Sequence, residues 1–448
     1  MIRMTRTHSA YAALFLILGG LLATGASATA QTATECPREV GAAVECWTGK
    51  DDNGAYYWIA KPKQWNGVLI VHAHGGPRMA PLGPDSSRPD LVRFSIMVKA
   101  GYAWVGTSYR RPGYGVRMGV KDAENSRRIF VDHIAKPRRT IAHGQSWGGK
   151  VAAKLNETIA ATPDGVRIYD GVLLTSGVIA GGVHGYDYRA DLRAVYQYYC
   201  HNHPRPDEAQ YPVWMGLPKG ATMRRKELAA RIDACTGIAT PAAQRTAEQQ
   251  QNLDNILDVT RIPERSLVSH MEWATNLFQD VTQRFLGGRN PFTNATVRYS
   301  GSSDDDALNR GIARFSADPA AVAQLADDSD MTGALKAPEI TMHAIHDPTA
   351  FVEHEARYHA AVAHAGKEDL LVQTFVDETQ HSYLTDADYI TVLNALMDWI
   401  DHGRKPTPAG IAAACPEAQR QFGGRCSFVP DFSPRPYFSR VLPRDGKG

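Results

Sequence analysis

Apolar positions along this chain alternate between two patterns, short continuous runs and longer stretches in which apolar side chains recur every three or four residues. Continuous runs bounded by turn residues are typical of buried strands of a parallel sheet, and the longer period is typical of helices with one buried face. Up to residue 175 the predicted strands are 56–61, 67–74, 102–107, 140–143 and 170–175, with helices at 122–135 and after residue 149. Strands that alternate with helices predict a parallel sheet with crossover helices.

This alternation stops for about 150 residues and then resumes. Residues 185–335 are more polar and rich in helical patterns, and include a Gln-rich stretch at 244–251. Strands are predicted again at 339–345 and 370–376, each followed by a helix, at 351–365 and 389–400. We interpret 185–335 as a mainly helical cap inserted between two core halves, 31–184 and 336–405, with a Pro-rich tail at 406–448. A separate domain with its own role is the alternative.

The first thirty residues have the pattern of a secretory signal peptide. Arg3 and Arg6 precede an apolar run at 10–23, and Ala28-Thr29-Ala30 is a small-residue cleavage site. Such segments are removed, so the mature chain is expected to start near Gln31 and to be secreted or periplasmic. An uncleaved anchor is the alternative. No later run is long and apolar enough to cross a bilayer, so no stable membrane insertion is expected after signal removal.

An exported chain can hold disulfides, and the six cysteines form three local pairs by proximity. Six cysteines allow fifteen connectivities, of which sequence proximity favours the nearest-neighbour one. The pairs are Cys36 with Cys46, Cys200 with Cys235, and Cys415 with Cys426. The cysteine and histidines of 200–203 lack the repeated spacing of a zinc site, so no metal site is expected.

Composition and charge exclude some partners. The 448 residues are 43% hydrophobic and 21% charged, which is ordinary for a globular protein. With 49 basic and 47 acidic side chains the net charge is +2, so no nucleic-acid partner is expected. The oligomeric state has no signature in the sequence.

The stretch with the clearest chemistry is Gly144-Gln145-Ser146-Trp147-Gly148, which follows a predicted strand and precedes a predicted helix. Gly-x-Ser-x-Gly in this context is the nucleophile elbow of an α/β-hydrolase fold. The Ser occupies a sharp, strained turn that projects its Oγ from the sheet edge, and a side chain at either Gly would crowd the neighbouring backbone.

A serine becomes a nucleophile only with a base and a group that orients the base. In this fold the order along the chain is Ser, acid, His. Asp347 follows the predicted strand 339–345, and His381 follows 370–376. Both would lie with Ser146 at the carboxyl edge of the sheet, where ligand sites of such folds occur. Asp377 and Asp369 are the rival acids.

Two glycines after the strand 67–74 could complete the site. His74-Gly75-Gly76-Pro77 predicts an oxyanion hole made by the N–H of Gly75 or Gly76 together with the N–H of Trp147. An ordinary turn is the alternative. The loop 109–114 lies at the same predicted edge, where it either touches substrate or forms surface.

With these motifs in order, the chain resembles the secreted α/β-hydrolase superfamily, and among its members exported serine esterases and their prolyl-oligopeptidase-like relatives. The resemblance covers about 56–174 and 338–403, and differs in having His346 and Gln380 where Gly is commoner. It implies Ser146, Asp347 and His381 as a triad, no cofactor, and a small-molecule or polymeric ester as substrate. The alternatives are a serine peptidase or amidase, and a hydrolase-fold protein that only binds.

Overall fold

The computed structural model describes Met1 and residues 31–444. Apart from Met1, the predicted signal peptide lies outside the described residues. No described helix combines the length and hydropathy needed to span a membrane.

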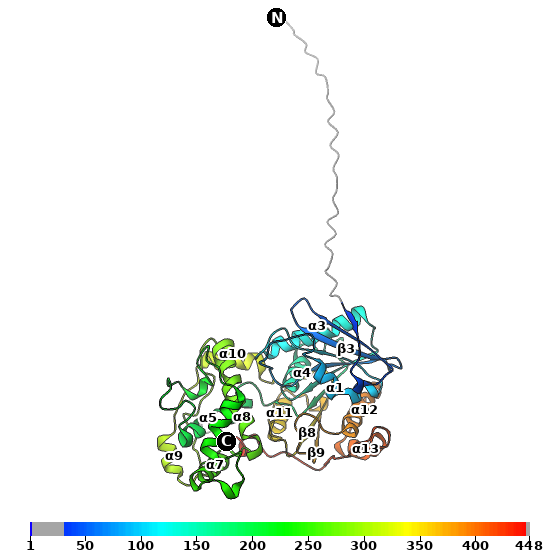
Figure 1. The fold of residues 1–448 in the computed structure, drawn as a ribbon. Helices are drawn as coiled ribbons and strands as arrows, with labels where there is room; N and C mark the ends of the chain where they lie inside the picture. Colours follow the sequence, from blue (N-terminus) through cyan, green and yellow to red (C-terminus); the bar gives the residue numbers. More distant parts are fainter. Residues whose placement is uncertain (2–30, 445–448) are drawn as a thin grey trace.

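A nine-stranded sheet in the order β1-β2-β3-β5-β4-β6-β7-β8-β9 organises the described part of the chain (Figure 1). The pairs β1–β2, β2–β3 and β3–β5 are antiparallel, and all pairs from β5 to β9 are parallel. The expected mostly parallel sheet is therefore confirmed. The strands are β1 (Thr32–Thr34), β2 (Val44–Lys50), β3 (Tyr56–Pro62), β4 (Val68–Ala73), β5 (Ala103–Thr107), β6 (Arg139–Gln145), β7 (Gly171–Thr175), β8 (Glu339–Ala344) and β9 (Leu371–Val376).

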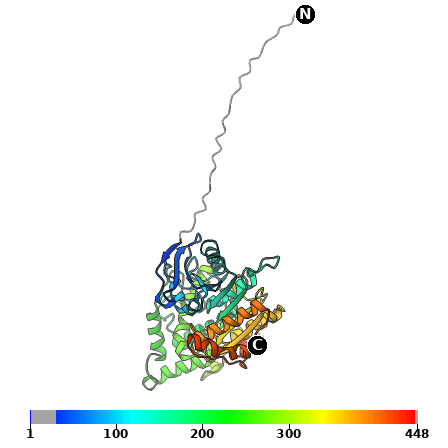
Figure 2. The same ribbon diagram turned by 90° about the vertical axis from the view of Figure 1, so that its right-hand side faces the viewer.

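Helices cover both faces of this sheet, and its central strands are therefore buried on both sides. One face packs on α3 (Val116–His133), α4 (Trp147–Thr158) and α11 (Glu353–His364). The opposite face packs on α1 (Arg88–Arg93), α2 (Ser95–Lys99) and α12 (Asp386–His402), with α13 (Pro408–Phe422) outside α12 (Figure 2).

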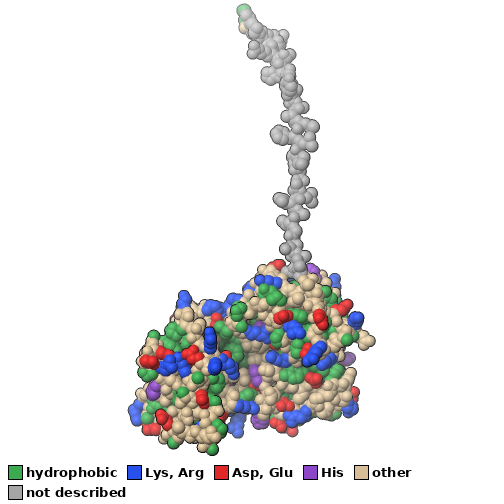
Figure 3. All heavy atoms as spheres, viewed as in Figure 1, with side chains coloured by type: hydrophobic (Ala, Val, Ile, Leu, Met, Phe, Trp, Pro, Cys, Tyr) green, Lys and Arg blue, Asp and Glu red, His purple; other side chains and the backbone are tan. Residues whose placement is uncertain are grey.

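The chain between β7 and β8 builds a second, helical lobe with a core of its own, beside the sheet. Its helices are α5 (Asp187–Cys200), α6 (Arg225–Thr236), α7 (Ala247–Thr260), α8 (Leu267–Glu272), α9 (Asp305–Gly311) and α10 (Pro319–Ser329), and two π-helical stretches, η6 (Trp273–Leu277) and η7 (Asp280–Phe285), follow α8. We call this lobe the cap. In the space-filling view a furrow separates it from the sheet-bearing body (Figure 3).

Short 3-10 helices connect these elements. They are η1 (Arg38–Val40), η2 (His184–Tyr186), η3 (Val213–Met215), η4 (Ala242–Gln244), η5 (Glu264–Ser266), η8 (Glu368–Leu370) and η9 (Tyr437–Ser439).

The structure differs from the sequence expectations at the N-terminal strands, at the start of α3 and in the tail. The antiparallel strands β1 and β2 were not anticipated, and α3 begins at Val116 rather than near residue 122. The Pro-rich tail contains α13 and then crosses to the cap, where the Arg444 guanidinium forms ion pairs with Asp187 (3.3 Å) and Asp191 (2.9 Å). This buried cluster joins the chain end to the first helix of the cap.

The six cysteines form three disulfides, in the nearest-neighbour pairing. Cys36–Cys46 ties the N-terminal segment to β2, Cys200–Cys235 joins α5 to α6, and Cys415–Cys426 closes the loop after α13. Three disulfides fit an oxidising, extracellular environment.

Candidate active site

Ser146 occupies the turn between β6 and α4 in a strained backbone conformation, with φ 57° and ψ −120°. The flanking glycines allow this turn to lie against its neighbours. A Cβ on Gly144 would lie 2.2 Å from the carbonyl oxygen of Gly148, and a Cβ on Gly148 would lie 1.9 Å from that of Ala73. No side chain fits at either position, so the strain at Ser146 is imposed by the close packing of β6, α4 and β4.

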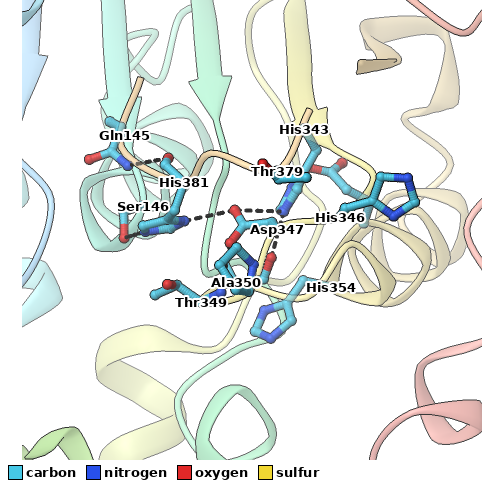
Figure 4. Close-up of polar contacts among 12 residues, drawn as sticks. Gln145, Ser146, His343, His346, Asp347, Thr349, Ala350, His354, Thr379 and His381 are labelled. Carbon is cyan, nitrogen blue, oxygen red and sulfur yellow. Dashed lines mark hydrogen bonds and ion pairs between the residues drawn. The ribbon is translucent and has the colours of Figure 1, made fainter. Parts of the chain in front are cut away.

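Ser146, His381 and Asp347 lie in a row, on the loops that follow β6, β9 and β8 (Figure 4). The Ser146 hydroxyl is 2.7 Å from His381 Nε2, and His381 Nδ1 is 2.7 Å from Asp347 Oδ2. Because a carboxylate only accepts, Nδ1 carries the proton and donates it, and Nε2 is free to accept from the hydroxyl. The Asp347 side chain is fully buried, whereas 13% of the His381 side chain is exposed.

The second oxygen of the Asp347 carboxylate is held by the backbone. Oδ1 accepts the N–H groups of Thr349 (2.7 Å) and Ala350 (3.0 Å), which fixes the carboxylate plane and leaves Oδ2 for His381. The rival acids lie elsewhere. Asp377 is exposed and pairs with His346 (3.5 Å), and Asp369 belongs to η8 at the start of β9, the opposite end of that strand.

A buried histidine lies behind Asp347. His343 Nδ1 donates to Glu355 (3.0 Å) and its Nε2 to the carbonyl of Ala350 (2.8 Å). Burial alone would lower the pKa of His343, but the hydrogen bond to Glu355 and the charges of Glu355 and Asp347 outweigh it and raise that pKa above its usual value. With both nitrogens donating, the ring is cationic and lies 3.7 Å from Asp347 Oδ2. It therefore stabilises a charged carboxylate in a fully buried position.

Two side chains hold the loops that carry His381 and Asp347. Gln145, beside the elbow serine, donates to the His381 carbonyl (3.1 Å). Arg265, from η5 of the cap, donates to the carbonyls of His346 (3.0 Å) and Thr379 (3.3 Å). The cap therefore bridges the two loops from the outside.

The predicted oxyanion residues surround the serine. A Cβ on Gly75 would lie 3.2 Å from the Ser146 Cβ, and Gly76 has a positive φ of 68° beneath the Trp273 ring. Within residues 31–444 the N–H groups of Gly75 and Gly76 form no hydrogen bond. Trp147 is the first residue of α4, so its N–H has no acceptor one turn earlier. Free backbone donors thus lie on both sides of the serine.

The loop 109–114 does not border the cavity over Ser146, and its middle residues 110–112 are half-buried while its two tyrosines are buried. Tyr109 packs against the His74 ring at a tilt, with ring centroids 4.1 Å apart, and its hydroxyl donates to the His74 carbonyl (3.3 Å). Tyr114 packs edge-on against Trp147 and donates to Ser329 (2.6 Å). Both tyrosines are buried and support the elbow and the glycine loop from below.

A cavity of about 520 Å³ opens over the serine, a size typical of small-molecule sites. The sheet side contributes Ser146, His381 and the glycine loop, and the cap contributes residues of α8 and η6, with Trp273 above Gly76. A π-helix is rare and often marks a functional site, because the widened turn redirects side chains. Figure 3 shows histidine and basic side chains inside the furrow between the lobes.

No group of three or more His, Cys, Asp or Glu side chains within the described ranges could hold a metal ion. Cys200 is in a disulfide, and His203 is buried against Thr275 (2.9 Å).

Comparison with known proteins gives weak sequence matches. No protein-family model matches the chain. A stretch of 116 residues is 28% identical to an o-phthalyl amidase of Xanthobacter agilis and covers 25% of this chain and 24% of the amidase. The chain therefore matches about a quarter of the length of this curated relative.

Solved structures of esterases resemble the chain over most of its length, at low identity. An esterase from Aspergillus oryzae has 13% identity and a TM-score of 0.46, with 84% of this chain and 85% of the esterase covered. Feruloyl esterase B from the same organism has 14% identity and a TM-score of 0.44, covering 81% and 82%. The strand order and the strained serine between β6 and α4 decide the fold. It is the α/β-hydrolase fold.

Several residues around this α/β-hydrolase site were missed by sequence reasoning. His343 and Glu355 are buried positions of β8 and α11, and the sequence pattern does not distinguish them from the core residues around them. Arg189, Arg265 and Trp273 belong to the cap, and no motif marks them. Gln145 was visible inside the Gly-x-Ser-x-Gly motif but had no assigned role.

Proposed function

We propose that this protein is a serine hydrolase that cleaves a carboxylic ester through an acyl-enzyme. Ser146 is the nucleophile, His381 the general base and acid, and Asp347 the group that orients His381. The observation that carries the proposal is the continuous hydrogen-bonded row from Asp347 through His381 to Ser146, which opens into a cavity of small-molecule size.

The reaction follows from the direction of these hydrogen bonds. Ser146 Oγ attacks the ester carbonyl while its proton passes to His381 Nε2, and the Asp347 carboxylate stabilises the imidazolium through Nδ1–H. The C–O bond to the alcohol then breaks, and the departing oxygen takes the proton from Nε2. Water repeats the sequence on the acyl-enzyme, which releases the acid and restores the Ser146 hydroxyl.

The tetrahedral intermediates carry a negative oxygen that needs donors in place beforehand. We assign this role to the N–H of Trp147 and to that of Gly75 or Gly76, since these groups flank Ser146 and have no acceptor among residues 31–444. One such donor contributes about 3–4 kcal/mol to transition-state stabilisation.

Covalent labelling tests the proposal. A fluorophosphonate probe should label the full-length mature protein at Ser146, as located by peptide mass spectrometry, and Ser146→Ala should not be labelled. Ser176 is a matched control, because it also follows a strand and has a positive φ of 46°, but within residues 31–444 its hydroxyl has no hydrogen-bond partner. Ser176→Ala should therefore still be labelled. A folded wild-type protein that resists labelling would exclude the enzyme and leave a binding protein.

An amidase is the second candidate, because the curated relative that matches a quarter of the chain is named an amidase. Acyl transfer to a serine is common to ester and amide cleavage, so the row of residues supports either. A 4-nitrophenyl ester and the 4-nitroanilide of the same acid distinguish them. We expect faster turnover of the ester after correction for the uncatalysed rates, and the reverse order would favour the amidase.

We also propose that residues 185–335 act as a cap that shapes the substrate cavity, and that the chain is exported with residues 1–30 removed. Five residues of α8 and η6 that border the cavity support the first point, and the three disulfides support the second. Mass measurement of the protein purified from the periplasm or medium should give a chain that begins near Gln31. An intact N-terminus there would refute signal cleavage.

A further inference from the structure

One wall of the cavity contains a buried arginine that has no acidic partner. Arg189 lies in the first turn of α5, borders the cavity that contains Ser146, and is only 3% exposed. Among the described residues no carboxylate oxygen lies within ion-pair distance of its guanidinium. An unpaired buried cation is costly, so its counter-charge is expected to come from outside the chain.

The other arginines around the cavity each have an acidic partner. Arg78 and Arg93 share the carboxylate of Asp90, and Arg225 pairs with Glu272. The cavity therefore has an excess of positive charge, and Arg189 is the buried arginine in it without a carboxylate.

The contacts of Arg189 are to neutral groups. Its Nε donates to His270 Nδ1 (3.2 Å), and Nη2 reaches the Thr349 carbonyl at 3.5 Å. His270 is a neutral partner and supplies no counter-charge. Its Nε2–H donates to the Pro348 carbonyl (2.7 Å). Burial and the nearby Arg189 charge hold its pKa well below the usual value. Nη1 forms no hydrogen bond within residues 31–444 and remains available to a ligand.

Aromatic rings surround the guanidinium. Its centre is 5.0 Å from the Tyr188 ring, 5.5 Å from Tyr186 and 6.0 Å from Trp273. Tyr186 and Trp273 also border the cavity. Rings packed around a guanidinium restrict its orientation, which suits a fork-like contact with a planar anion.

We propose that Arg189 binds a free carboxylate of the substrate, and that the enzyme acts on half-esters of dicarboxylic acids or the corresponding half-amides. The inference rests on the proposed hydrolase function and narrows its substrate class. The carboxylate pairs with Arg189, Tyr186 and Trp273 contact the apolar spacer, and the scissile carbonyl lies at Ser146.

A purely structural role for Arg189 makes a different prediction. Arg189 also supports the loop that holds Asp347. It does so directly at Thr349, and indirectly through His270, which contacts Pro348. If it only positioned that loop, its loss would slow charged and neutral substrates by the same factor.

Two substrates that differ only in charge distinguish these roles. Mono-4-nitrophenyl adipate has a free carboxylate, and its methyl ester does not. We expect the wild type to prefer the free acid by about 10- to 100-fold in kcat/KM, the range of a hydrogen bond to a charged group. Arg189→Gln should remove this preference, mainly through a higher KM for the acid, and Arg189→Lys should retain part of it.

The double replacement Arg225→Gln with Glu272→Gln is the matched control, since it removes a complete ion pair from the same cavity. It should keep the preference for the acid within about threefold, because the net charge of the cavity is unchanged. Equal rates of the wild type on both substrates, or an equal loss on both in Arg189→Gln, would overturn the proposal.

A binding measurement separates this inference from the hydrolase assignment. Monomethyl adipate should bind the Ser146→Ala protein in a calorimetric titration, and at least about tenfold more weakly when Arg189→Gln is added. If the wild type cleaves neither ester but this difference in binding is found, the carboxylate site stands and the hydrolase assignment fails. If the esters are cleaved and no difference is found, the carboxylate site fails alone.

Discussion

The replacement Asp347→Asn tests the proposed row of residues atom by atom. Oδ1 accepts the N–H groups of Thr349 and Ala350. The carboxamide oxygen of the asparagine must therefore take that position, because its NH₂ group would place donor against donor there. The new NH₂ group then occupies the position of Oδ2, which is 2.7 Å from His381 Nδ1. An amide NH₂ only donates, so Nδ1 must become the acceptor and the ring proton moves to Nε2.

This tautomer cannot act as a base toward Ser146, because Nε2 already carries its proton. The side chain keeps its size and its backbone hydrogen bonds, so the protein should fold. We expect kcat/KM to fall by about 10³- to 10⁴-fold, or about 4–5.5 kcal/mol, the effect of a wrong tautomer in a triad.

The assay compares kcat/KM on a 4-nitrophenyl ester and the rate of fluorophosphonate labelling, with thermal unfolding as a check on folding. Asp377→Asn is the control, since this carboxylate is the nearer one to His381 in sequence but is exposed and pairs with His346. Its activity should stay within about threefold of wild type, as for other exposed ion pairs. A folded Asp347→Asn protein within tenfold of wild-type activity, or a larger loss in Asp377→Asn, would refute the reasoning.

Three further predictions concern stability and the elbow. Gly148→Ala puts a Cβ 1.9 Å from the Ala73 carbonyl oxygen, so we expect a lower unfolding temperature and at least about 100-fold lower activity, and a wild-type melting curve with full activity would contradict this. Burial raises the pKa of Glu339 from 4.5 to about 8, so the wild type loses stability as pH rises through that interval. Glu339→Gln can still form hydrogen bonds with Asn156 and Tyr358 but does not titrate. Between pH 4.5 and pH 9 its free energy of unfolding in urea should therefore rise relative to that of the wild type by up to about 5 kcal/mol, and a pH-independent difference would refute the assignment. Replacing both Cys200 and Cys235 with Ser opens a link across 35 residues and should cost about 3–4 kcal/mol in urea unfolding, whereas an unchanged midpoint would show that the disulfide adds nothing.

Local patterns in the sequence determined the alternation of strands and helices and the turn at Ser146. These signals are local because a buried parallel strand needs a continuous apolar run, and a strained serine turn needs glycine at 144 and 148. The loops of Asp347 and His381 could also be placed at the edge of Ser146, since parallel strands end at one side of a sheet.

Only the tertiary structure decided which side chains meet at that edge. Asp347 rather than Asp377 faces His381 because two backbone N–H groups fix its carboxylate, a contact that no spacing rule predicts. Arg189 and Arg265 extend from the cap and contact the loop that holds Asp347. In each of these contacts the two residues are more than 75 positions apart in the sequence. Hydrophobic periodicity shows which residues are buried but carries no information on their partners, so contacts between distant segments of the chain require the folded molecule.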